Sequence, residues 1–236
     1  GLLLIAGSTP PIAFAQTAVL VKDIHPTGSS NPAGATRMLN DWNQPDVSRR
    51  EFAVYNGLAY FRADDGTHGA ELWRTDGTPG GTVLVEDLHP SGSSFPQSFV
   101  VLSSGVYFTA EDATGEGVWR ATAAGITLVE RFDDVGGLFK AGDRVFFAAD
   151  DGVHGREPWM IAADGAAQLV FETLPGTDSA LPSQVWFHPG TGTDVYFTLD
   201  RGNGASIWRT RGTDATTVSL EIGNVPGRTD VYPANT

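Results

Sequence analysis

The chain has 236 residues with 29 glycines, 14 prolines and no cysteine, and its formal net charge is −13. The lack of cysteine excludes disulfides, thiolate metal sites and a cysteine nucleophile. The negative charge argues against nucleic-acid binding, because affinity for phosphate backbones comes from clustered Lys and Arg. Charged residues are sparse and helical periodicity is absent from every long segment, so the composition favours many short strands joined by tight turns.

Residues 1–15 have the pattern of the end of a secretory signal peptide. The apolar run 2–6 precedes two prolines, and Ala13 and Ala15 form the small-x-small pattern of a cleavage site. The run is too short to cross a bilayer as a helix, and the alternative is a buried apolar strand. We expect the mature chain to begin near Gln16 and to lie outside the cytoplasm, in the periplasm or at the cell surface.

Residues 16–236 form an array of repeated units. Each unit has a pair of aromatic residues followed, eleven or twelve residues after the second one, by a tryptophan. The pairs are 60–61, 107–108, 146–147 and 196–197, and the tryptophans are Trp73, Trp119, Trp159 and Trp208. Constant spacing inside each unit and variable spacing between units indicate strands joined by loops of different length.

Each unit reads as four strands. In the second unit we expect them at 97–103, 105–111, 116–122 and 126–131. Val106, Phe108 and Ala110 point to one face of the second strand, and Tyr107 and Thr109 point to the other. Both faces are thus mostly apolar, which predicts that each sheet packs between two other sheets. We also expect the tryptophans to fill the space between neighbouring sheets, rather than to stack on sugars.

The predicted fold is all-β, a β-propeller of four-stranded antiparallel blades whose units end near residues 87, 131, 172 and 221. The segment 17–23 matches a fourth strand and would be an orphan strand, a fifth copy without its first three strands. We expect a later unit beyond Thr236 to supply those partners, which makes the chain a C-terminally truncated fragment of a propeller with at least five blades. Residues 222–236 would be the linker into the next blade.

The first unit is longer than the others, and its excess falls around residues 33–52. This insertion contains Arg37, Trp42, Arg49 and Arg50, residue types that dominate binding hot spots. It is the best candidate contact surface, because functional residues gather in loops on rigid scaffolds. The alternative is a packed excursion whose tryptophan covers the rim of the array.

The segment 71–78, Glu-Leu-Trp-Arg-Thr-Asp-Gly-Thr, followed by Gly81-Thr82 and Asp87, resembles the ELWxxDGT repeat family of bacterial secreted and surface proteins. Only the first unit matches the signature in full, and the other three match in part. The resemblance implies extracytoplasmic placement and a β-propeller-like array. It implies no settled activity.

Two stretches are the strongest candidates for a functional site: 64–69, Asp-Asp-Gly-Thr-His-Gly, and 150–155, Asp-Asp-Gly-Val-His-Gly. Asp64, Asp65, Asp150 and Asp151 could bind Ca²⁺ through oxygen ligands. The same order of Asp and Gly also makes a hairpin turn in which the carboxylate accepts backbone hydrogen bonds. One such loop supplies too few oxygens for Ca²⁺, so we interpret both as turns and predict no metal ligand and no cofactor.

Catalytic motifs are missing from the sequence: it has no nucleophile elbow, no zinc-protease motif and no phosphate-binding glycine loop. We therefore predict no catalytic residue. The expected function is that of a secreted or cell-surface scaffold that binds an unidentified protein or glycan, without nucleic acid and without a transmembrane segment. The alternative is an enzyme, a hydrolase or lyase, that acts on polysaccharide in the central funnel of the propeller, and a third possibility is a passive spacer in a longer surface protein.

Overall fold

A computed structural model describes residues 20–30, 52–173, 176, 187–200 and 205–220 of the chain. Within these ranges the fold is all-β: seventeen strands form four antiparallel sheets, with one short 3-10 helix beside the last of them. No helix in the described part of the chain is long and apolar enough to span a bilayer. The expected signal-peptide remnant at 1–15 and the expected linker at 222–236 lie outside the described residues.

The first two sheets each contain four strands in sequence order. The first sheet comprises β1 (Phe52–Tyr55), β2 (Leu58–Asp64), β3 (Ala70–Thr75) and β4 (Val83–Glu86). The second comprises β5 (Gln97–Leu102), β6 (Gly105–Asp112), β7 (Gly115–Thr122) and β8 (Gly125–Phe132). The strands predicted for the second unit are therefore confirmed to within one residue at each end.

The third sheet has five strands because its first strand is split in two. It comprises β9 (Asp134–Val135), β10 (Phe139–Lys140), β11 (Val145–Asp150), β12 (Arg156–Ile161) and β13 (Ala167–Leu169). Both β9 and β10 pair with β11. The fourth sheet comprises β14 (Phe187–Pro189), β15 (Val195–Asp200), β16 (Ala205–Thr210) and β17 (Val218–Leu220), with helix η1 (Asp214–Thr216) before the last strand.

The four sheets share one register. In each sheet the second aromatic residue of the pair stands directly opposite the tryptophan on the next strand. These cross-strand pairs are Phe61 with Trp73, Phe108 with Trp119, Phe147 with Trp159, and Phe197 with Trp208. The sequence repeat is therefore a structural repeat, and the residues between aromatic and tryptophan are one β-hairpin.

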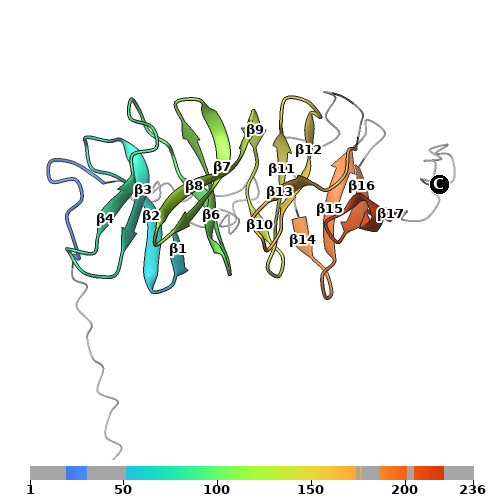
Figure 1. Cartoon of the computed structure of the whole chain (residues 1–236), viewed down its shortest axis with the longest axis horizontal. Helices are drawn as coiled ribbons and strands as arrows, with labels where there is room; N and C mark the ends of the chain where they lie inside the picture. The colour runs from blue at the N-terminus through green and yellow to red at the C-terminus, as the bar shows by residue number, and fades with distance from the viewer. Residues whose placement is uncertain (1–19, 31–51, 174–175, 177–186, 201–204, 221–236) are drawn as a thin grey trace, which may run out of the picture.

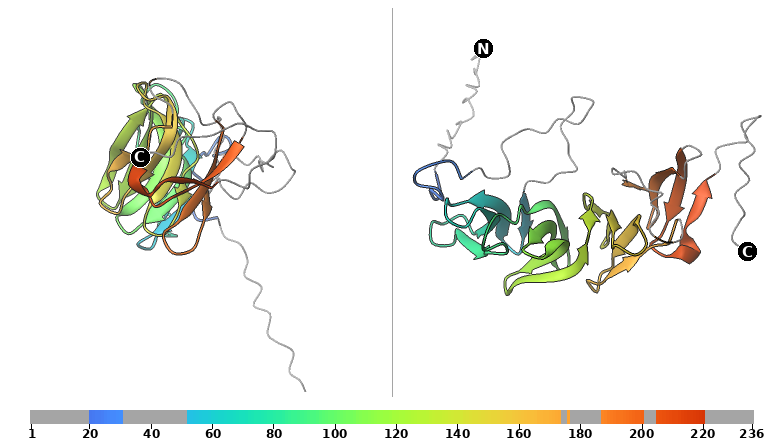
Figure 2. Two further views of the ribbon diagram at one scale, coloured as in Figure 1. Left: turned by 90° about the vertical axis from the view of Figure 1, so that its right-hand side faces the viewer. Right: turned by 90° about the horizontal axis from the view of Figure 1, so that it is seen from above.

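The sheets stand face to face in a slightly curved row (Figures 1 and 2). Successive residues of a strand point to opposite faces, so each aromatic pair serves two neighbours. Tyr107 packs in a core with Phe147 of the third sheet, whereas Phe108 packs in a core with Tyr60 of the first. A third core, around Phe146 and Phe197, joins the third and fourth sheets. The prediction that each sheet packs between two others is confirmed for the second and third sheets, while the first and fourth each pack against one described sheet.

Three of the four tryptophans of the repeat lie in or against these cores, as predicted, whereas Trp73 is buried outside them, under Lys22. Trp119 belongs to the core between the first two sheets, and Trp159 belongs to the core between the second and third. Trp208 is partly buried and packs against the core between the third and fourth sheets, where its ring stacks on that of Phe171. Their large apolar rings therefore serve packing between sheets.

The first sheet has a face that no other described sheet covers, although Lys22 lies over the ring of Trp73 there. Phe52 and Val54 on β1 are 60% and 58% exposed. Phe61, opposite Phe52, is only partly buried, whereas its counterpart Phe108 in the second sheet is fully buried. This face is thus apolar, like the faces that pack in the cores, but among the described residues no second sheet packs against it.

The expected orphan strand at 17–23 is a correction. Residues 20–23, the described part of it, are not in a strand, and Leu20 is 76% exposed. The physical reason is that a strand exists through its ladder of hydrogen bonds, and these residues join no ladder of the described sheets. Lys22 nevertheless contacts the first sheet, since its Nζ donates to the carbonyl of Thr82 at 2.7 Å.

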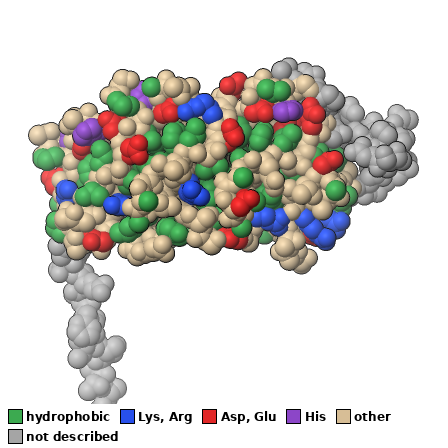
Figure 3. Space-filling view, in the orientation of Figure 1, with side chains coloured by type: hydrophobic (Ala, Val, Ile, Leu, Met, Phe, Trp, Pro, Cys, Tyr) green, Lys and Arg blue, Asp and Glu red, His purple; other side chains and the backbone are tan. Residues whose placement is uncertain are grey.

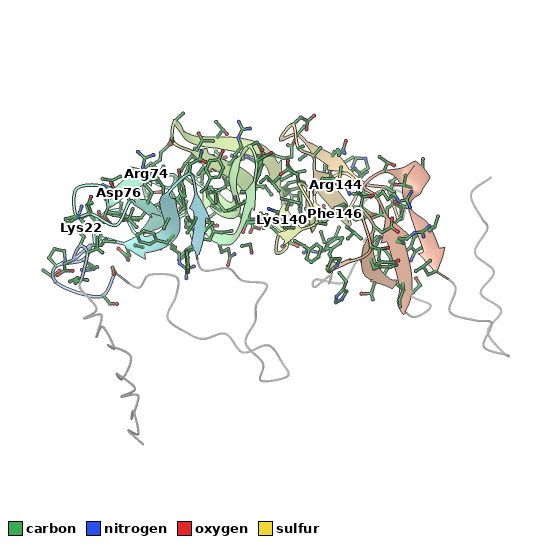
Figure 4. The ribbon with its side chains drawn as sticks, turned by 90° about the horizontal axis from the view of Figure 1, so that it is seen from below. Lys22, Arg74, Asp76, Lys140, Arg144 and Phe146 are labelled. Atoms are coloured by element: carbon green, nitrogen blue, oxygen red, sulfur yellow. The ribbon has the colours of Figure 1, made fainter. Side chains whose placement is uncertain are left out.

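Antiparallel order divides the loops between two edges of the row. The turns between second and third strands and the connectors between sheets lie along the upper edge in Figure 1. The other turns lie along the lower edge, onto which Figure 4 looks. There the sheets are tied to one another: the Oγ of Ser103 donates to Asp143 at 2.5 Å, and Nη2 of Arg144 donates to the carbonyl of Thr193 at 2.9 Å. The lower edge is therefore a seam between sheets.

Candidate functional site

Two turns of the upper edge share one conformation. They join β2 to β3 and β11 to β12, in the first and third sheets. In the first turn Asp64 Oδ1 accepts from the amide of Gly66 at 2.7 Å, and in the second Asp150 Oδ1 accepts from the amide of Gly152 at 2.8 Å. Both glycines have positive φ, 81° and 77°, a conformation that side chains disfavour. The Asp-Asp-Gly order thus builds a tight turn, as predicted.

The second aspartate of each turn holds the histidine that follows. Asp65 Oδ2 lies 2.8 Å from Nδ1 of His68, and Asp151 Oδ2 lies 2.7 Å from Nδ1 of His154. The other carboxylate oxygen of each accepts two backbone amides of its own turn, for Asp65 those of Thr67 and His68. Each aspartate is therefore fully engaged inside the turn, and each imidazole is fixed through Nδ1.

Each aspartate–histidine pair shifts the pKa of both of its side chains. The hydrogen bond to Asp65 raises the pKa of His68, and the negative charge of Asp65 adds to it. Burial alone would raise the pKa of Asp65, but the hydrogen bonds from His68 and Thr67 outweigh burial and lower that pKa. His154 and Asp151 show the same two directions for the same reasons. Each turn thus favours an ion pair of carboxylate and imidazolium.

The arrangement leaves one ring nitrogen outside the turn. With Nδ1 bound to a carboxylate, Nε2 is the atom that a histidine can offer to a ligand or to a proton. The side chains of His68 and His154 are 40% and 37% exposed. The two histidines are nevertheless in the first and third sheets, with the second sheet between them, so the row does not bring them into one site.

A buried carboxylate fastens the connector between the first and second sheets. Glu71 on β3 is fully buried. Its oxygens accept from the amide and hydroxyl of Ser94, at 2.8 and 2.6 Å, and from the amide of Leu88 at 3.1 Å. Burial raises the pKa of Glu71, while these hydrogen bonds oppose the rise. Glu71, part of the repeat signature, therefore holds the segment that leads into β5.

The same device recurs in the third sheet. Glu157 on β12 is also fully buried and accepts from the amide and the hydroxyl of Thr173, at 3.1 and 2.7 Å. In the second sheet the glutamate stands at a neighbouring position of the strand. This residue, Glu116, accepts from the amide of Val135 at 3.3 Å. The glutamate of the repeat thus fixes the upper-edge connectors in space. A carboxylate within otherwise apolar strand segments was the sequence signal for this role.

The structure places the candidate metal-binding aspartates in turns, whereas it does not describe most of the candidate insertion. Asp64, Asp65, Asp150 and Asp151 all lie in upper-edge turns. In the described part of the chain, no group of three or more His, Cys, Asp or Glu side chains is placed to hold a metal ion. The insertion at 33–52 lies outside the described residues except for Phe52. Ser30, which precedes it, lies at the upper edge, since its carbonyl accepts from the amide of Asp64 at 2.9 Å, and Phe52, its last residue, begins β1.

Charge is also unevenly divided between the edges. In Figure 3 the visible histidines and many Asp and Glu side chains lie along the upper edge. The upper-edge segments include Asp64, Asp65, Asp87, Glu111, Asp112, Asp133, Asp134, Asp150 and Asp151. Two arginines on this edge are paired internally: Arg131 with Asp112, and the buried Arg156 with Asp134. The upper edge therefore presents an excess of negative charge.

No protein-family model matches the sequence, and no curated protein matches it. Among solved structures, a protein assigned as TolB from Agrobacterium tumefaciens is similar with a TM-score of 0.42 and 13% identity. The match covers 69% of this chain and 60% of that one. A prolyl endopeptidase structure is similar with a TM-score of 0.42 and 14% identity, over 77% of this chain and 30% of that one. The chain thus spans less than two thirds of the length of either structure.

Proposed function

We propose that this chain is part of a secreted or cell-surface β-propeller that binds a partner at its upper edge and carries out no catalysis. The observation that carries the proposal is the set of buried glutamates, Glu71 and Glu157, which hold the upper-edge connectors rigidly beside the Asp-His turns. Connectors and turns fixed to a packed scaffold are the usual place for recognition, because the scaffold limits the entropy lost on binding.

The propeller assignment is supported by the repeat of four sheets in a shared register and by the three cores between them. A row of face-packed sheets leaves two end faces, and a ring removes them. The outer face of the first sheet, where Phe52 and Val54 are exposed, is apolar in the manner of the faces already packed. We infer that a further blade covers it, consistent with the resemblance to the ELWxxDGT repeat family.

Placement outside the cytoplasm is supported by the cleavage-site pattern at 13–15. A direct check is a fusion of this chain, with residues 1–15 kept, to alkaline phosphatase, an enzyme active only after export. Phosphatase activity in intact bacteria is expected. Activity confined to a cytoplasmic reporter fused at the same point would reject the export proposal.

Binding is tested with the full chain immobilised and probed with purified bacterial envelope polysaccharide, peptidoglycan and solubilised envelope proteins. We expect retention of one fraction without release of new reducing ends or peptides. The double variant Glu71→Ala/Glu157→Ala, which releases both connectors, should weaken retention, whereas Glu86→Ala on the exposed side of β4 should not. Depolymerisation of a retained polymer would favour the enzyme instead, and retention of none would reject the scaffold.

A further inference from the structure

Phe95 has an unusual backbone at the upper edge. It lies in the connector between the first two sheets, its φ is +47°, and its side chain is 50% exposed. A bulky residue at positive φ is a genuine outlier, and the α regions are further disfavoured before a proline, here Pro96. The chain therefore holds an aromatic ring in water at a position where glycine would be relaxed.

The surrounding hydrogen bonds force this conformation. Ser94, just before Phe95, gives its amide and hydroxyl to buried Glu71 and accepts the amide of Glu111 at 2.9 Å. The amide of Phe95 itself donates to the carbonyl of Ala70 at 3.1 Å, and the hydroxyl of Ser93 accepts from the amide of Ala70 at 2.9 Å. Strain persists only where neighbouring structure over-determines it, and such positions cluster at ligand clamps.

Packing does not explain the ring. Phe95 belongs to none of the three apolar cores, and it makes no ring pair among the described aromatic residues. The loops that flank it are polar: 64–70 carries Asp65 and His68, and 89–94 carries serines. A protein interface would be expected to place such a ring within a wider apolar patch. A single ring with hydrogen-bonding groups around it suits a ligand that has an apolar face and a hydroxyl rim.

We propose that Phe95 is the stacking platform of a glycan site, and that the ligand is a neutral sugar chain such as a hexose or N-acetylhexosamine polymer. This rests on the proposed function and names its ligand class. The ring covers the apolar face of one sugar, while His68, which Asp65 holds through Nδ1, and the exposed Ser91 are the groups within the flanking loops that hydrogen-bond hydroxyls. The excess of carboxylates along the upper edge disfavours uronic-acid and sulfated polymers by repulsion.

The test titrates the full chain with chitotetraose, with cellotetraose and with trigalacturonate as the polyanion. We expect at least one neutral tetramer to bind, with amide shifts confined to 64–70 and 89–97, and trigalacturonate to bind at least tenfold more weakly. Phe95→Ala and Phe95→Gly should each reduce affinity tenfold or more, as expected for the loss of one stacked ring. Val153→Ala, a 62% exposed residue at the upper edge of the third sheet, is the matched control and should leave affinity unchanged.

Stability separates a binding role from a structural one. Glycine adopts φ of +47° without strain, so Phe95→Gly should keep or raise the melting temperature while it abolishes sugar binding. A lower melting temperature for Phe95→Gly, unchanged affinity in that variant, tighter binding of trigalacturonate, or no binding of either neutral tetramer would each overturn the glycan site. Retention of an envelope fraction that Phe95→Ala does not affect would reject this site and leave the scaffold proposal standing.

Discussion

Gly69 and Gly92 touch through bare backbone: a Cβ placed on Gly69 would overlap the carbonyl oxygen of Gly92. This contact joins the β2–β3 turn to the connector that leads into the second sheet. Gly69 also has a φ of +74°, so both its conformation and its surroundings require the absence of a side chain. The turn and the connector at the upper edge therefore form one packed unit.

Gly69→Ala should lower the free energy of unfolding by about 2–4 kcal/mol, because it adds a backbone clash to the cost of positive φ. Gly77→Ala is the matched control. Gly77 has a φ of +89° and nothing within 4 Å of its Cβ position, so only the conformational cost of about 1 kcal/mol remains. Urea unfolding of the two variants measures the difference, and equal losses would show that the contact contributes nothing.

Glu71→Ala should lower the free energy of unfolding by about 3 kcal/mol, since it leaves the buried donors of Ser94 and the half-buried amide of Leu88 without an acceptor. Glu71→Gln keeps one acceptor and should cost less. The control is Glu86→Ala, because that side chain is exposed on β4 and should change stability by less than about 0.5 kcal/mol. If Glu71→Ala were as mild as Glu86→Ala, the carboxylate would not be what fastens the connector.

The Asp65–His68 pair should be visible in an NMR titration. The pKa of His68 is raised above 6.5 by Asp65, so Asp65→Asn should return it toward that value while His154 keeps its own raised pKa. A raised histidine pKa stabilises the fold fully below pH 6.5, and this contribution is lost as the pH rises through the raised value. The lowered pKa of Asp65 sets the acid limit, since its contribution is lost as the pH falls below 3.8 toward the lowered value.

Thermal unfolding with Ca²⁺ and with chelator should give the same melting temperature. The carboxylates of Asp65 and Asp151 are engaged by backbone amides and a histidine within each turn, which leaves too few oxygens for the six or more ligands that Ca²⁺ takes. A ligand that binds only the native state raises the melting temperature. A Ca²⁺-dependent rise that disappears when Asp64, Asp65, Asp150 and Asp151 are changed to Asn would contradict the interpretation as turns.

Acid stability should depend on the pair of Asp112 and Arg131. The guanidinium donates through both terminal nitrogens, at 3.0 and 2.7 Å, and this lowers the pKa of Asp112 far below 3.8. The stabilisation is present above pH 3.8 and is lost as the pH falls through the lowered pKa. Arg131→Lys cannot form the double contact and should cost about 1 kcal/mol at neutral pH. The cost should shrink in acid, and a cost independent of pH would point to packing.

Much of the fold could be predicted because local periodicity and global packing agree. Val106, Phe108 and Ala110 alternate with Tyr107 and Thr109, which is enough to assign a strand buried on both faces. The turn at Asp64–Gly69 was equally readable, since Asp and Gly there meet the hydrogen-bonding and φ demands of a tight turn. These features depend on neighbours in the sequence.

Other features depend on residues far apart, and the sequence alone could not provide them. The partner of Glu71 is Ser94, 23 residues away, and nothing in the repeat signature names it. The positive φ of Phe95 follows from bonds to Ala70 and Glu111 rather than from its own preference. The split of the third sheet's first strand around Gly136 and Gly137 was also missed for this reason.

The arrangement of the three cores determines which of the four sheets should unfold first. Each interior sheet shares apolar side chains with two neighbours, whereas the first and fourth sheets each share them with one described neighbour. In such linear arrays stability is close to a sum of nearest-neighbour terms. Unfolding of this chain should thus begin at its ends and move inward, with the second and third sheets exchanging their amide hydrogens last.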